Sequence, residues 1–327
     1  MNPVFETLPG AEVAVGEIPR ALARLWEGEA AAGQGAPSEF RASQMNLVLH
    51  FGLAATPADA LAQFLVALRF AERYPCRLIA LVPVAGLPAR AAMQAKIDSQ
   101  CYVGRSRREM VCTEAIVLAY PQDTRGFVAD LVSTLVEADL PIYYWVHRFS
   151  SCRRLADYDY LLRAARRFVF DSAIAPDDAL AYPWPRPEAF RDLAAARLLH
   201  VRQLLGQFLS GFPPEAIGRG LVAATVRYGA EMKAEARCLA AWTGSALARC
   251  APGTVPLPPT VELAGELGAK ELELRFGYGD ARYFRWRADL APGWAGFDAD
   301  FGAGRVQHCA AVQLAAPEAA LGEAFFF

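Results

Sequence analysis

The sequence carries almost no excess of charge of either sign and very little lysine. Its 33 basic and 35 acidic residues give a formal net charge of -2, and lysine occurs only at Lys96, Lys233 and Lys270. A chain this close to neutrality has no overall attraction to nucleic acid or to an anionic membrane surface. Its basic groups are arginines, so we expect any anion-binding site to be built from guanidinium groups.

Cysteine patterns and long apolar runs are also missing. The seven cysteines include no C-x-x-C pair, and their odd number argues against a disulfide framework. No apolar run reaches the roughly 18–20 residues that a membrane-spanning helix needs. The first ten residues lack the basic and apolar regions of a secretory signal. We therefore expect a cytoplasmic protein with reduced thiols and no membrane partner.

The motifs that mark common enzyme classes are absent. There is no P-loop and no G-x-S-x-G nucleophile elbow, and Gly302-Ala303-Gly304 lacks the third glycine and the strand–helix context of a dinucleotide site. The four histidines lie far apart in sequence, and none has a second ligand at metal-binding spacing. The sequence thus predicts no catalytic residue, no metal and no cofactor.

Apolar residues, in contrast, are abundant. Hydrophobic residues make up 54% of the chain and charged residues 21%, the opposite of a disordered composition. The 327 residues suggest two domains. We place an N-terminal extension at residues 1–43, an α/β domain at 44–182 and an α+β domain at 188–327, divided by the stiff segment Pro183–Pro187.

In the first half, short aliphatic runs alternate with helical periodicity. Residues 46–51 are typical of a strand, and the following helix has Thr56 as its N-cap and Pro57 at its first position. A further helix is expected over residues 152–165. Further strands are expected at residues 77–82, 110–120, 141–146 and 167–171, with residues 102 and 103 as a hairpin arm. This alternation favours a mixed, partly parallel sheet covered by helices.

The second half has longer helices and then a strand-rich end. An apolar stripe at steps of four and three predicts one long helix from Phe190 to Phe208, and Arg197 interrupts the stripe. A further helix is expected over residues 230–249. Residues 271–276 alternate apolar and polar side chains and return as a hairpin over residues 281–287. We expect an α+β domain of long helices and an antiparallel sheet.

Two groups of polar residues are candidate sites. Five lie at or just beyond the expected carboxyl ends of strands, where open α/β sheets usually bind ligands: His50, His147, Arg148, Asp171 and Ser172. They could hold a sugar phosphate, or they could be ordinary strand-end groups that bond loop backbone. Three more lie in one polar turn and could meet an acidic surface, a phosphate or only solvent: Arg105, Arg107 and Arg108.

Two further features leave alternatives open. Arg197 must reach water or pair with a carboxylate of this chain or of a partner, because an unpaired buried charge is costly. The chain ends in three aromatic residues, 325–327. They could anchor in a groove of a partner protein, or close the core of this one.

Short segments along the chain follow a recognisable order. They are Asn46–Val48, Tyr74–Leu81, Cys101, Cys112–Ile116, Ala138–Trp145 and Val169–Ser172, continued by Asp192, Arg197, Arg202 and Glu235–Trp242. In this order they resemble the OpcA family of glucose-6-phosphate dehydrogenase assembly proteins, over roughly residues 44–250. The tryptophans that the family usually has beside the aspartate–arginine helix motif are missing here, where Ala195 and Val201 lie.

The resemblance implies a non-catalytic accessory protein. Such a protein binds glucose-6-phosphate dehydrogenase and promotes its assembly or allosteric activation, which feeds NADPH production through the oxidative pentose phosphate pathway. Asp192, Arg197 and Arg202 are then the first candidates for partner contact, ahead of the three turn arginines. Cys76 and Cys101 match family cysteines and are candidates for redox control. The alternative is a sugar-phosphate-binding enzyme or ligand sensor that uses the strand ends of the first domain.

Overall fold

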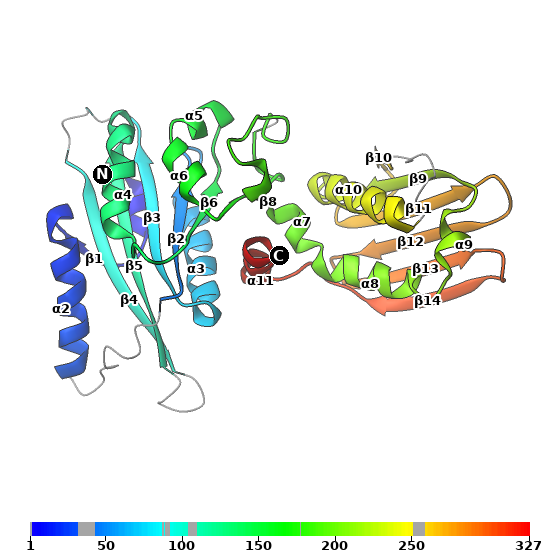
Figure 1. Cartoon of the computed structure of the whole chain (residues 1–327), viewed down its shortest axis with the longest axis horizontal. Coiled ribbons are helices and arrows are strands. Elements are labelled where there is room, and N and C mark those ends of the chain that lie inside the picture. Colours follow the sequence, from blue (N-terminus) through cyan, green and yellow to red (C-terminus); the bar gives the residue numbers. More distant parts are fainter. Residues whose placement is uncertain are drawn as a thin grey trace. The chain divides into compact units, whose positions relative to one another are not determined.

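The structure, a computed structural model, describes residues 2–31, 43–86, 88, 92–103, 110–176, 178–250 and 259–327. The chain forms two compact units: unit 1 comprises Met1–Leu193 and Ala324–Phe327, and unit 2 comprises Ala194–Glu323 (Figure 1). The division falls beyond the proline-rich segment at residues 183–187, because the chain first adds one more strand to the sheet of unit 1.

Unit 1 is built on an eight-stranded sheet of order β1-β4-β5-β3-β2-β6-β7-β8. Neighbours from β5 to β8 are parallel, and β4 and β1 add an antiparallel edge. The central strand β2 is buried along its whole length, as a parallel strand covered on both faces must be. The strands are β1 Ala11–Val13, β2 Met45–Phe51, β3 Cys76–Val84, β4 Gln94–Val103, β5 Met110–Pro121, β6 Ile142–His147, β7 Arg167–Phe170 and β8 Phe190–Asp192. The expected mixed, partly parallel sheet is confirmed.

Helices cover this sheet. They are α1 Pro3–Thr7, α2 Ile18–Ala31, α3 Pro57–Arg73, α4 Arg125–Leu135, α5 Cys152–Ala156 and α6 Asp159–Ala164. The expected start of α3 is confirmed: Thr56 accepts a hydrogen bond from the backbone N–H of Asp59, and Pro57 opens the helix. The single helix expected over residues 152–165 is wrong. It is divided at Tyr158, whose backbone leaves the helical conformation and whose hydroxyl bonds Tyr120 in the core.

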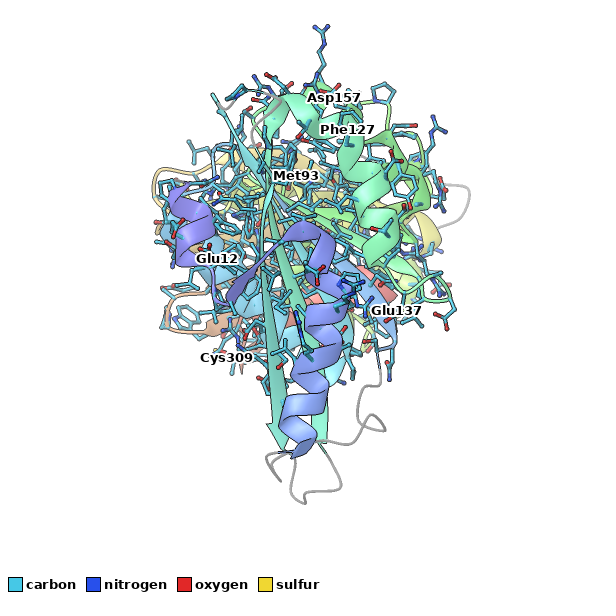
Figure 2. The ribbon with its side chains drawn as sticks, turned by 90° about the vertical axis from the view of Figure 1, so that its left-hand side faces the viewer. Glu12, Met93, Phe127, Glu137, Asp157 and Cys309 are labelled. Atoms are coloured by element: carbon cyan, nitrogen blue, oxygen red, sulfur yellow. A yellow bond between two sulfur atoms is a disulfide. The ribbon has the colours of Figure 1, made fainter. Side chains whose placement is uncertain are left out.

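The N-terminal segment is tied to the sheet edge. The buried Lys96 ammonium on β4 donates hydrogen bonds to the carbonyl oxygens of Phe5, Glu6 and Leu8 and lies 4.7 Å from the centre of the Phe5 ring. The end of α1 is therefore bonded by a cation, which also balances the partial negative charge of the helix end. Figure 2 looks onto this side of unit 1, with α2 beside β4 and Glu12 marking β1.

The last four residues complete the core of unit 1. The Phe325 side chain is 1% exposed, with its ring centre 5.0 Å from that of Tyr143 and 5.6 Å from that of Phe70. Phe326 packs on Tyr74 at 4.6 Å. Phe327 is 81% exposed. Two of the three terminal aromatics thus close this chain's own core, and the third reaches solvent.

Unit 2 is an antiparallel sheet with helices on one face. The sheet order is β10-β9-β11-β12-β13-β14, and only the β10–β9 pair is parallel. The strands are β9 Leu221–Tyr228, β10 Thr260–Leu263, β11 Glu271–Tyr278, β12 Tyr283–Asp289, β13 Trp294–Asp300 and β14 Val306–Ala311. The helices that pack on the sheet are α8 Leu199–Leu209, α9 Pro214–Gly218 and α10 Lys233–Cys250. Two further helices, α7 Leu193–Arg197 and α11 Pro317–Phe326, belong in part to each unit. The expected α+β half with an antiparallel sheet is confirmed.

One expectation for this half is wrong. The one long helix predicted from Phe190 to Phe208 begins only at Leu193, because residues 190–192 form the edge strand β8. It is also divided into α7 and α8 at Leu198, whose backbone leaves the helical conformation. The Phe190 ring packs on Phe170 and Trp184 of unit 1, which holds this residue in the sheet. Among the described residues, no helix is long and apolar enough to cross a membrane.

The packing of the C-terminal aromatics generates the first prediction. Phe325→Ala removes a fully buried ring, so we expect it to lower the free energy of unfolding by about 3–5 kcal/mol. Phe327→Ala, the matched control two residues further along the chain, removes an exposed ring, so its unfolding free energy should stay within about 0.5 kcal/mol of the parent. Urea denaturation of both variants measures this. Equal effects of the two substitutions would contradict the packing described.

Candidate functional site

Three charged or polar groups meet at the carboxyl edge of the parallel sheet in unit 1. Asp59 lies in the first turn of α3, which follows β2, while His147 ends β6 and Arg148 follows it. Oδ2 of Asp59 lies 2.7 Å from Nε2 of His147 and accepts a hydrogen bond of 2.7 Å from Nε of Arg148. His147 and Arg148 were expected at this edge. Asp59 was not named as a site residue, although its place in the first turn after a parallel strand is a usable signal.

The backbone beside this cluster is strained at Arg148 and tightly packed at Gly52. Arg148 has a left-handed conformation, with φ of 55°, which costs a non-glycine residue about 1 kcal/mol or more. A Cβ on Gly52 would lie 2.1 Å from the carbonyl oxygen of Arg148. The Gly52 N–H donates a 2.7 Å hydrogen bond to the carbonyl oxygen of His147. Glycine at position 52 therefore lets the ends of β2 and β6 approach closely enough to form the cluster.

The electrostatics of the cluster follow from burial and pairing. Burial lowers the pKa of His147 and outweighs the hydrogen bond to Asp59 that raises it. Burial by itself raises the pKa of Asp59. The hydrogen bonds and charges of His147 and Arg148 outweigh this effect, so the pKa of Asp59 lies below its usual value. At neutral pH the cluster therefore consists of an ionised carboxylate between a neutral imidazole, which donates from Nε2, and a guanidinium.

His50 takes no part in this cluster. It pairs in register with Val146 while Phe51 pairs with His147, so the two histidines point to opposite faces of the sheet. The His50 ring is buried, with Nδ1 and Nε2 each 2.7 Å from a tyrosine hydroxyl, those of Tyr144 and Tyr120. Burial lowers its pKa to about 3. It is a neutral core histidine at physiological pH.

Asp171 and Ser172 lie at the end of β7 and shape its turn. Asp171 accepts a hydrogen bond from the N–H of Ala173, and the Ser172 N–H donates to Oδ1 of Asp192. A pocket lined in part by Arg148 and Asp171 has a volume of only about 20 Å³, room for roughly one water molecule. A sugar phosphate would fit here only if these loops moved.

The arginines expected to contact a partner are paired inside the chain. Nε and a terminal nitrogen of Arg197 donate to Oε1 of buried Glu235, at 3.1 and 2.5 Å. Arg202 donates to Glu323 at 2.8 Å. Both pairs lie within unit 2. The third group of candidates, Arg105, Arg107 and Arg108, lies outside the residues that the structure describes.

The cysteines depart from the expectation of reduced thiols. Cys101 on β4 and Cys112 on β5 lie opposite each other in register and form a disulfide. Cys76 is a buried free thiol, and burial raises its pKa to about 12, so it stays protonated. Of the two redox candidates, Cys101 is therefore in a disulfide with Cys112, whereas Cys76 is a buried thiol. The signal lay in the expected hairpin, which places these two residues across from each other.

No group of three or more potential metal ligands occurs among the described residues. The family match lies within unit 1. Residues 67–182 match the family model for the glucose-6-phosphate dehydrogenase subunit N-terminal domain of the OpcA type. A putative OxPP cycle protein OpcA of Synechococcus elongatus is 24% identical over 173 residues, 45% of this chain and 38% of that protein. The expected resemblance to the OpcA family is confirmed over residues 67–182. The chain matches well under half the length of this OpcA protein.

The OpcA match includes the disulfide and the His147–Arg148 end of β6, while unit 2 lies outside the matched range. Among solved structures, KijD10, a 3-ketoreductase from Actinomadura kijaniata, aligns with 86% of this chain and 88% of its own. The TM-score is 0.42 and the identity 12%. So distant a likeness carries no argument about function.

The disulfide generates the second prediction. Its two cysteines are 11 residues apart, and a cross-link that closes a loop of this length is expected to add about 3 kcal/mol to stability. The double variant Cys101→Ser/Cys112→Ser should lose about that amount in urea denaturation without reductant. Cys309→Ser, which changes an exposed free thiol, is the control and should be neutral. Free thiols at positions 101 and 112 in the unreduced protein, detected by mass spectrometry, would refute the assignment.

The buried His50 generates the third prediction. Its pKa in the folded state, about 3, lies below its ordinary value of 6.5, so only the unfolded chain binds this proton at intermediate pH. The associated stability is present above pH 6.5 and is lost as pH falls toward 3, by up to about 1.4 kcal/mol per pH unit. His50→Gln should therefore flatten the decline of unfolding free energy between pH 6.5 and 4.5. His200→Gln, at an exposed position, should keep the parental slope, and a common slope for both variants would count against a neutral His50.

Proposed function

We propose that this protein is a non-catalytic accessory protein that binds glucose-6-phosphate dehydrogenase and promotes its assembly or allosteric activation in the oxidative pentose phosphate pathway. The observation that carries the proposal is the OpcA family match over residues 67–182. The resemblance noted at Asp192, Arg197 and Arg202 extends it toward unit 2. We place the protein in the cytoplasm, where this pathway supplies NADPH.

The mechanism we infer is thermodynamic linkage. A protein that binds the active conformation or oligomer of an enzyme more tightly than the inactive one shifts the enzyme toward activity. A tenfold shift requires only about 1.4 kcal/mol of differential affinity. No reacting group is needed for this role, and a rigid surface is sufficient. The parallel sheet of unit 1, fixed at its carboxyl edge by Asp59, His147 and Arg148, is such a scaffold.

The internal ion pairs limit which of the arginines expected to contact a partner can do so without disrupting unit 2. Arg197 would have to leave a buried carboxylate to reach a partner, and loss of that pairing would strand Glu235 in the core. The Arg202 side chain is more exposed than that of Arg197, so its bond to Glu323 could be exchanged for one to a partner carboxylate. We therefore assign Arg197 a positioning role in unit 2 and keep Asp192 and Arg202 as contact candidates.

The second candidate function is a sugar-phosphate-binding enzyme or ligand sensor. The left-handed backbone at Arg148, beside the Asp59 carboxylate, favours it, because strain of this kind accumulates at binding sites. Such a site binds ligand without any dehydrogenase. Heat-stabilisation of the purified protein by glucose 6-phosphate or 6-phosphogluconate would support it, since binding to the native state raises stability.

The accessory role generates the fourth prediction. Adding the purified protein to glucose-6-phosphate dehydrogenase of the same organism should lower the apparent KM for glucose 6-phosphate or raise kcat, and the two proteins should co-elute in size-exclusion chromatography. Steady-state kinetics are measured with and without dithiothreitol, so that the Cys101–Cys112 disulfide is tested in both states. Heat-denatured protein serves as the control. Absence of a complex together with unchanged kinetics in both redox states would reject the proposal.

A further inference from the structure

One face of the unit 2 sheet has no helix against it in the described part of the chain. Helices α8, α9 and α10 pack against the other face through apolar residues such as Leu205 and Leu239, which share a core cluster with Leu274 of β11. Figure 1 shows α10 beside β9. The strands alternate, so every second residue points away from these helices. The outward positions form the surface that we call the open sheet face.

The strand register fixes which side chains share this face. One row across β9, β11, β12, β13 and β14 contains Arg227, Glu273, Arg287, Gly296 and Cys309. The next row contains Thr225, Arg275, Arg285, Asp298 and Gln307. Charged groups therefore gather over the centre of the sheet, in a domain whose opposite face is apolar.

A single buried carboxylate organises the arginines. Glu273 has no exposed surface and accepts hydrogen bonds from Arg227 at 2.9 Å, Arg275 at 3.0 Å and Arg285 at 2.5 Å. Burial by itself raises the pKa of Glu273. The three guanidinium groups outweigh this effect, so the pKa of Glu273 lies below its usual value. The carboxylate is therefore ionised at neutral pH and holds three guanidinium groups in fixed positions.

The two carboxylates that bind these arginines lie deeper than the guanidinium groups. Glu271 and Glu273 are buried, whereas the side chains of Arg275, Arg285 and Arg287 are 42%, 48% and 36% exposed. Asp298 in the second row is partly exposed and pairs with Arg305. Arg285 engages Glu273 through Nε, one of the five N–H donors of a guanidinium group. The face thus presents ordered guanidinium edges to solvent. The internal pairs already hold these arginine side chains in one conformation. Binding a second carboxylate therefore costs less side-chain entropy.

An exposed tryptophan lies beside these arginines. Trp294 on β13 is 47% exposed, and an atom of its indole ring lies 3.7 Å from where a Cβ on Gly296 would be. The indole therefore lies over Gly296, next to Arg287 in the same row. Tryptophan and arginine are the residues most enriched at energetic centres of protein interfaces.

We propose that the open sheet face is the docking surface of this protein for an acidic patch on its partner protein, with Trp294 and Arg287 as its anchor residues. The inference rests on the proposed function, in which that partner is glucose-6-phosphate dehydrogenase. Each of these arginines already has an internal carboxylate, so the face lacks the net positive charge that a polyanion requires. It fits a protein surface that offers individual carboxylates and an apolar contact for the indole.

The decisive experiment measures the affinity of the dehydrogenase for full-length variants by surface plasmon resonance. Trp294→Ala and Arg287→Ala should each bind at least tenfold more weakly than the parent, as expected for interface centres. Two controls change exposed residues of unit 2 away from this face: Leu263→Ala on the edge strand β10 and Arg219→Ala after α9. Both should bind as the parent does. Thermal denaturation of all four variants separates lost contact from lost folding.

The outcomes separate the two proposals. If the parent chain does not bind the dehydrogenase, the proposed function fails, and this assignment fails with it. If the parent binds and both Trp294→Ala and Arg287→Ala bind equally well while folded, the open sheet face is overturned and the proposed function stands. Because the contacts are ionic, the parental affinity should also fall as salt is raised from 50 to 300 mM, and a salt-independent affinity would count against an acidic partner patch.

A second readout needs no substitution on the face. Cys309 is an exposed free thiol that lies opposite Gly296, so a bound partner should shield it. Saturating dehydrogenase is expected to slow its alkylation by iodoacetamide at least fivefold, followed at the peptide level by mass spectrometry. Cys238 on α10, in the helix layer of the same unit, is the internal reference and should react at an unchanged rate. Unchanged alkylation of Cys309 in the complex would overturn the proposal.

Discussion

Arginine paired with a buried carboxylate is the interaction on which both units depend. In unit 1, Arg77 bonds the buried Glu114 and also reaches Glu137, and in unit 2 the same arrangement recurs at Glu235 and Glu273. An ionised carboxylate inside a protein is tolerated only when a hydrogen-bonded cation compensates its lost hydration. Each buried carboxylate of this kind therefore requires an arginine beside it, so part of the arginine content of the chain serves the interior and not the surface.

This constraint also explains why charge on a helix is a poor guide to a binding surface in this chain. Arg197 interrupts an apolar stripe, and the sequence leaves open whether it meets water, a partner or a carboxylate of this chain. In the structure it meets Glu235 of α10 and joins two helices of unit 2. The arginines of the open sheet face differ, because they reach over their carboxylates to solvent. The carboxylates of Glu235 and Glu273 are both buried, and what distinguishes these arginines is the exposed fraction of their own side chains, 19% for Arg197 and 48% for Arg285. The sequence does not record this exposure.

The sequence predicts local structure well where the physical cause is local. Thr56 and Pro57 mark the start of α3 because capping and proline geometry act within one turn, and the alternating residues 271–276 form β11 because one face of a strand is buried. It fails where a distant contact decides. Phe190 follows helical spacing but is held in β8 by Phe170 and Trp184, and no spacing rule brings Asp59 to His147, 88 residues away.

The candidate residues show the same division. His50 and His147 are both near strand ends in sequence, and their different roles follow from the parity of the strands: His50 aligns with Val146 and enters the tyrosine-lined core, while His147 aligns with Phe51 on the other face. A register known in advance would have separated them, because one residue of shift exchanges the two faces. The same holds for Cys101 and Cys112, whose pairing is a matter of hairpin register. The strand register, which depends on which strands pair, must therefore be known before the sequence can predict which of these residues share a site.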